Sequence, residues 1–167
     1  MKRIILAAAI LLGTFGLASA QNTASAGVSI NGEVIKGITL TVSTATLNLG
    51  TMVAGTTPAA VSASTSPIMF TLTGNGSSSI SVTYLPVSLI GSNGGSLTFA
   101  STVIGDSSSA SQASAPSISS GASITLGGAN YSVANFYFWL GGSVGSVPAN
   151  QPPGSYNGTF TLSVAYN

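Results

Sequence analysis

The chain has no cysteine and no histidine, and only 3% of its residues are charged. Thiolate and imidazole are the main protein ligands of zinc, iron and copper, so their absence excludes most sites for these metals. It also excludes the Ser–His and Cys–His pairs that activate catalytic nucleophiles. Because disulfide bonds are excluded as well, the folded chain must be stabilised by its core, by subunit contacts, or by both.

Acidic side chains are nearly absent too, since Glu33 and Asp106 are the two carboxylates of the sequence. They lie far apart along the chain, and a glycosidase-like pair would need both of them at one site. Solvated loop or edge positions are the simpler interpretation of both residues. We therefore expect no enzymatic activity, no cofactor and no metal ion.

The start of the chain has the pattern of a secretory signal peptide. Two basic residues precede an apolar run from Ile4 to Leu17, and Ala18-Ser-Ala20 follows. The run is shorter than the roughly 20 residues that a membrane-spanning helix needs. We expect residues 1–20 to be removed, although a second Ala-Ser-Ala at Ala24 to Ala26 leaves a later cleavage site open. The protein is therefore expected to pass through the periplasm and to be secreted or held at the cell surface.

Removal of this segment changes the charge of the chain. One lysine (Lys36) remains against Glu33 and Asp106, so the net charge becomes −1. Nucleic-acid binding requires several basic residues that neutralise phosphates, so no nucleic-acid partner is expected. The remaining residues number about 147, which is the size of one domain that buries about two-thirds of its unfolded surface. Low charge also removes a common barrier to self-association.

Apolar residues alternate with small or polar ones along most of the remaining chain. The clearest run is the last one, which places Phe160, Leu162, Val164 and Tyr166 on one predicted strand face. Turn-forming clusters of glycine and asparagine separate the runs, and nothing after the signal segment has the pattern of a long amphipathic helix. Many short strands at this spacing predict an all-β sandwich or barrel.

Two segments depart from the simple alternation. The segment Phe136 to Leu140 is apolar on both faces, which predicts a strand covered on both sides, with Trp139 in the core. The segment Gly105 to Gly121 consists mainly of Ser and Ala, so we expect an exposed, mobile loop. Asn75-Gly-Ser and Asn157-Gly-Thr match the N-glycosylation pattern, but Asn-Gly is also a strong turn signal, which is the interpretation we favour.

Four motifs occur in order along the chain: Leu47-Asn-Leu-Gly-Thr-Met-Val-Ala-Gly55, Met69 to Gly76, Leu126-Gly-Gly128 and Gly154 to Tyr166. Together they resemble the motifs of the DUF4402 family of secreted bacterial proteins. The resemblance runs from about residue 38 to the end, and the closing motif is its most specific part. The function of the family is poorly defined, but it is similar to fimbrial and spore-coat-type adhesin domains. The resemblance therefore implies an immunoglobulin-like or pilin-like antiparallel β-sandwich, here over residues 37–167.

The end of the chain also resembles the subunits of chaperone–usher pili. Those pilins end in alternating apolar residues, with a penultimate tyrosine and a glycine fourteen positions from the terminus, which correspond to Tyr166 and Gly154. Their terminal strand pairs with a periplasmic chaperone and later lies beside an N-terminal strand donated by the next subunit. The matching donor lies in the N-terminal extension, residues 21–36, where the in-phase positions are Ala24, Ala26, Val28 and Ile30. Unlike the common pilins, this chain has no cysteine pair.

We therefore expect a secreted, non-enzymatic structural protein that forms a fimbria or surface filament by strand donation. Its implied partners are further copies of itself and a periplasmic chaperone. The first alternative is a monomeric secreted adhesin or carbohydrate-binding sandwich, whose glycan platform would contain Tyr131, Tyr137, Trp139 and Tyr156. An outer-membrane β-barrel is the second alternative, because its strands also alternate.

Overall fold

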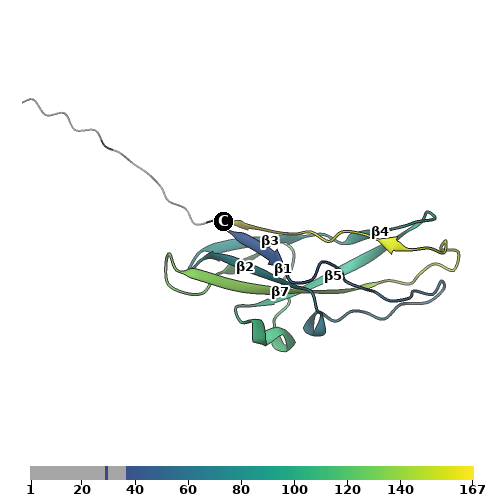
Figure 1. The fold of residues 1–167 in the computed structure, drawn as a ribbon, viewed down its shortest axis with the longest axis horizontal. Coiled ribbons are helices and arrows are strands. Elements are labelled where there is room, and N and C mark those ends of the chain that lie inside the picture. Colours follow the sequence, from purple (N-terminus) through teal and green to yellow (C-terminus); the bar gives the residue numbers. More distant parts are fainter. Residues whose placement is uncertain (1–28, 30–36) are drawn as a thin grey trace, which may run out of the picture. The chain divides into compact units, whose positions relative to one another are not determined.

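The computed structural model describes residue 29 and residues 37–167 (Figure 1). The expected signal peptide lies outside the described residues. So do the donor positions that the sequence predicts, Ala24, Ala26, Val28 and Ile30. The fold described below is that of residues 37–167.

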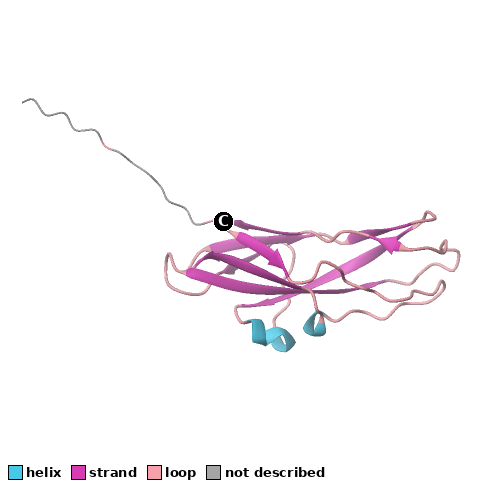
Figure 2. Ribbon diagram, viewed as in Figure 1, coloured by secondary structure: helices cyan, strands magenta, loops and turns pink. Residues whose placement is uncertain are grey.

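Residues 37–167 form nine strands and two short 3₁₀ helices (Figure 2). The larger sheet has six strands, in the spatial order β1 (Thr39–Val42), β2 (Met69–Asn75), β7 (Val133–Val144), β5 (Ser96–Asp106), β4 (Val87–Gly91) and β8 (Tyr156–Asn157). The smaller sheet has three, in the order β6 (Ala122–Thr125), β3 (Ser79–Tyr84) and β9 (Leu162–Tyr166). The helices are η1 (Ala63–Thr65) and η2 (Ser109–Ser114). All strand pairs in both sheets are antiparallel, which confirms the expected all-β, sandwich-like fold.

Neither helix in this part of the chain has the length and apolar character that crossing a membrane would require.

The central strand β7 is covered on both faces, as its doubly apolar sequence predicts. Phe136, Phe138 and Leu140 face the main core, which lies between the two sheets. On the opposite face, Trp139 is 2% exposed and packs with Ala63 and Ile104 in a second, smaller cluster. Both faces of β7 therefore take part in packing, and Trp139 contributes to a core.

The second cluster lies beneath η1 and η2, which pack on the same side of the larger sheet (Figure 2). The side-chain amide of Gln112 donates hydrogen bonds to the carbonyl oxygens of Ala63, at 2.9 Å, and Ser66, at 2.8 Å. Gly141 permits the close approach of η1, because a Cβ at this position would collide with backbone atoms of Val61 and Ala63. The segment 105–121 is thus largely exposed, as expected, but its helix is anchored over a buried tryptophan.

The predicted terminal strand is present as β9, but it begins at Leu162, so the expectation that Phe160 belongs to it was wrong. Leu162 is buried and Val164 and Tyr166 are half-buried, while Ser163 and Ala165 are exposed, which confirms the alternation. The hydroxyl oxygen of Tyr166 accepts a hydrogen bond from the backbone N–H of Asn75 at 2.7 Å. This bond ties the end of β9 to the end of β2, which belongs to the other sheet.

Candidate assembly groove

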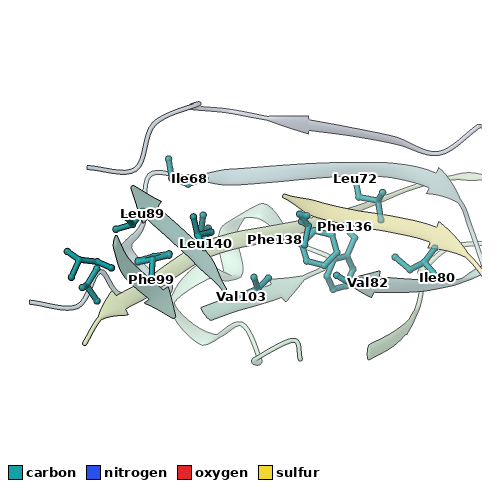
Figure 3. Close-up of a cluster of buried hydrophobic side chains, with 14 of the residues drawn as sticks. Ile68, Leu72, Ile80, Val82, Leu89, Phe99, Val103, Phe136, Phe138 and Leu140 are labelled. Carbon is teal, nitrogen blue, oxygen red and sulfur yellow. The ribbon is translucent and has the colours of Figure 1, made fainter. Parts of the chain in front are cut away.

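An open groove of about 900 Å³ exposes one end of the main core. Its floor consists of buried side chains from the larger sheet and its flanks, including Ile68, Leu89, Leu97, Phe99, Leu140 and Val147. In Figure 3, Ile68, Leu89 and Phe99 lie at one end of the core. The side chains that the smaller sheet contributes, Ile80 and Val82, lie at the other end. No strand of the smaller sheet lines the groove, so the floor lies where that sheet does not extend.

The first wall of the groove is an extended segment, residues 44–54, that follows β1. Leu47, Leu49 and Met52 are half-buried and pack against the main core. The wall is held at both ends: Ser43 N–H donates to Met69 O at 2.8 Å, and Gly55 N–H donates to Val147 O at 2.9 Å. The apolar side chains of this wall narrow the groove without filling it.

The second wall is formed by residues 151–160, which lead into β9. Phe160 packs its ring at 6.0 Å from Phe70 and at 5.9 Å from Tyr84, measured between ring centroids. The hydroxyl of Tyr156 donates to Pro152 O at 2.6 Å and accepts from the side-chain amide of Gln151 at 2.8 Å. This wall is therefore fixed by aromatic packing at one end and by polar contacts at the other.

Backbone groups have few partners along most of the first wall and at the end of the second wall that leads into β9. Residues 44–52 make no backbone–backbone hydrogen bond to any other described residue, and neither do residues 158–161. One local side-chain bond occurs, in which Gly50 N–H donates to Asn48 Oδ1 at 2.8 Å. Both segments are extended or irregular chain bordering an apolar floor, an arrangement that can accept a further strand.

The outer edge of β9 also carries backbone groups in position for pairing. Asn167 N–H donates to Ser79 O on β3. Ala165 and Ser163 alternate with Asn167 along the strand and pair with β3, so their backbone groups also face β3. Antiparallel strands direct the backbone groups of alternate residues to opposite sides. The N–H and C=O groups of Leu162, Val164 and Tyr166 therefore point to the open edge of β9, while their side chains point into the core.

The open edge of β1 likewise carries backbone groups in position for pairing. Because Ser43 N–H bonds to β2, the in-phase residues Thr39 and Thr41 direct their backbone groups to β2 as well. Those of Leu40 and Val42 therefore face the open edge. The first wall follows β1, and the second wall leads into β9. The open edges of these two strands are therefore continuous with the groove.

The structure distributes the predicted terminal-strand residues between the groove and the core. Phe160 and Gly154 line the groove, whereas Leu162, Val164 and Tyr166 extend from it between the sheets. Gly154 has a φ of +154°, and a Cβ there would lie 2.6 Å from Ser92 Oγ. The sequence interpretation missed the first wall, although the alternation of Leu47 and Leu49 was visible.

The four aromatic residues considered for a glycan platform do not share an exposed face. Trp139 is buried and stacks with the half-buried Tyr137 at a centroid distance of 6.4 Å. Tyr156 packs against the main core instead. Tyr131 is 80% exposed on the loop before β7.

Reactive side chains are not gathered in the described part of the chain. No three residues among His, Cys, Asp and Glu come together there. Gly141 to Gly145 has the Gly-x-Ser-x-Gly spacing of a nucleophile elbow. However, Ser143 lies within β7 opposite Ala100, and the chain has no histidine to act as its base.

These features define an all-β, sandwich-like domain whose distinctive site is a groove with an apolar floor, bordered in part by unpaired backbone groups. The family model described as "Domain of unknown function (DUF4402)" matches residues 29–166. The chain therefore belongs to the DUF4402 family, as its motifs indicated. No curated protein matches the chain.

Proposed function

We propose that this protein is a non-enzymatic structural subunit of an extracellular filament or surface layer, and that a strand donated by a second copy occupies the groove. The observation that carries this proposal is the groove itself, where core side chains form the floor and unpaired backbone groups border it. Residues 1–20 would direct the chain out of the cytoplasm, and a periplasmic chaperone would cover the groove before assembly.

A donated strand would satisfy both the unpaired backbone groups and the exposed apolar floor of the groove. Its backbone supplies a hydrogen-bond ladder to the unpaired groups, and its inward side chains cover the apolar floor. Burial of Ala24, Ala26, Val28 and Ile30 would contribute on the order of 4–8 kcal/mol before ordering costs, with most of it from the two larger side chains. Residues 21–31, when extended, span about 36 Å. The segment is therefore long enough to run through the groove and beside a neighbouring strand.

The test compares three variants of the mature chain with the wild type by negative-stain electron microscopy and by mass in solution. The first lacks residues 21–30, the second carries Val28→Ser and Ile30→Ser, and the third carries Ser25→Asn and Ser29→Asn. Ser25 and Ser29 have the opposite phase, so the third variant changes two side chains that would not face the groove and serves as the matched control. We expect filaments from the wild type and the control only. Unchanged filaments from the deletion variant would refute donation by this segment.

A monomeric secreted adhesin is the second candidate. The observation in its favour is that the main core, including Leu72, Ile80 and Phe138, is buried within a single chain. A wild-type protein that stays monomeric in solution at all concentrations and forms no filaments would favour this candidate.

A further inference from the structure

We propose that Tyr131 and Val133 form a second contact between copies, in which they dock against the subunit that receives the donated strand. This inference rests on the proposed function and identifies an interface that strand donation alone does not require. We call the loop 127–133, together with the facing turn 76–78, the tyrosine tip.

The tyrosine tip presents two large apolar side chains to solvent. Tyr131 is 80% exposed and Val133 is 66% exposed, and they are separated by a single residue. Tyrosine is enriched at protein interfaces because it supplies a large contact area with few rotatable bonds. The tip contains no charged residue, so its burial against a second copy would leave no ionised group without water.

The tip is also held in a defined conformation. Tyr131 and Ser77 are the two non-glycine residues with positive φ among the described residues, at +64° and +59°. Such backbone angles cost on the order of 1–3 kcal/mol and persist where the surrounding structure fixes them. Here Gly76 N–H donates to Ser132 O at 2.8 Å, and Ser77 Oγ donates to Gly128 O at 2.7 Å. The exposed side chains are thus pre-positioned, which lowers the entropic cost of docking.

The position of the tip links it to strand donation. Thr39, the first residue of β1, lies opposite Thr73, which in turn lies opposite Asn135 on β7. Val133 is two residues beyond Asn135 on the same strand. Two strand spacings and two residue rises place Val133 about 12 Å from Thr39. The tip therefore lies at the end of the domain where the N-terminal extension joins β1.

The length of the connecting chain limits how far the recipient can lie from the tip. Nine residue steps separate Ile30, the last in-phase donor position, from Thr39, and they span at most about 31 Å. A recipient that holds Ile30 must therefore sit within that distance of the start of β1. Because Tyr131 and Val133 project from the same end, the recipient is the partner that they can reach.

The experiment measures the lowest protein concentration at which mature chains assemble. The test variant carries Tyr131→Ser and Val133→Ser, and the matched control carries Leu85→Ser. Leu85 is 76% exposed but follows the far end of β3, about 20 Å along that strand from the turn of the tip. We expect the test variant to need about tenfold more protein or higher, with the control unchanged and all three proteins melting at the same temperature.

A second measurement uses the absence of cysteine in the chain. A single Tyr131→Cys carries a thiol-linked photo-crosslinker, which should join two copies only when they are assembled. The inference is wrong if filaments form and the test variant matches the wild type, if Leu85→Ser has the same effect, or if crosslinks stay within one chain. If the wild type forms no filaments, the proposed function fails first and this inference falls with it.

Discussion

Replacement of Tyr166 by phenylalanine removes one hydroxyl from the joint between the two sheets. The Tyr166 oxygen accepts the N–H of Asn75 at 2.7 Å, in a part-buried position. A Cβ on Gly74 would lie 3.0 Å from the same oxygen, so the hydroxyl sits against the backbone of β2 with little room for a replacement water. Tyr166→Phe would therefore leave a partly buried N–H without its acceptor.

An unsatisfied buried donor costs about 1–3 kcal/mol, and we take the lower half of that range because the site is only part-buried. We expect the free energy of unfolding to fall by about 1–2 kcal/mol, which corresponds to about 3–6 °C in the melting temperature of a domain of this size. The assay is chemical denaturation of the mature protein, followed by circular dichroism. Tyr137→Phe is the matched control, because the half-buried Tyr137 hydroxyl makes no hydrogen bond to another described residue.

The two roles considered for Tyr166 give opposite results. If its hydroxyl acts within the fold, Tyr166→Phe loses stability and still assembles once folded. If the hydroxyl instead meets a chaperone or a neighbouring subunit, stability stays at the wild-type value while secretion or assembly fails. That second outcome would refute our assignment of the Tyr166–Asn75 bond as a stabilising contact between the sheets.

Three further predictions concern the walls, the covered tryptophan and the charge of the domain. Amides of residues 44–52 should exchange with solvent rapidly in the unassembled protein and become protected in filaments, which hydrogen-exchange mass spectrometry would detect; equal exchange in both states would exclude this wall as a pairing edge. Gln112→Ala should release η2 from its two carbonyl partners and shift the fluorescence of Trp139, the one tryptophan of the chain, toward longer wavelength, whereas Ser114→Ala should not. The free energy of unfolding of residues 37–167 should vary by less than about 0.5 kcal/mol between pH 5 and pH 9, because this region contains no histidine and no cysteine, the side chains that ordinarily change charge in that window; a steeper pH dependence of chemical denaturation would contradict this.

The local sequence pattern predicted the strands whose burial follows from the order of apolar and polar residues within a few positions. Leu162, Val164 and Tyr166 face inward because a strand covered on one side buries every second residue. The stretch from Phe136 to Leu140 likewise indicated two covered faces. In both cases the information lies within a few consecutive residues.

The features that the sequence did not reveal depend on distant parts of the chain. Gln112 anchors η2 by reaching carbonyl groups 49 and 46 residues away, which no local composition can indicate. The first wall of the groove was missed for a related reason. Leu47 and Leu49 show an extended segment, but whether its backbone finds a neighbour depends on the order of strands in the sheet.

The open edges and the low charge of this domain both favour pairing with another chain. Many β-proteins protect exposed edges with lysine, proline or an inward-pointing charge, since an unprotected edge pairs with other chains. Neither β1 nor β9 contains any of these, and Asp106 is the one charged residue in residues 37–167. Since these edges lack the usual defences and are continuous with a groove that has an apolar floor, we propose that a specific occupant limits non-specific pairing. A donated strand with its apolar residues in phase satisfies the backbone and the floor together, which neither a lone ligand nor simple stacking of subunits would do.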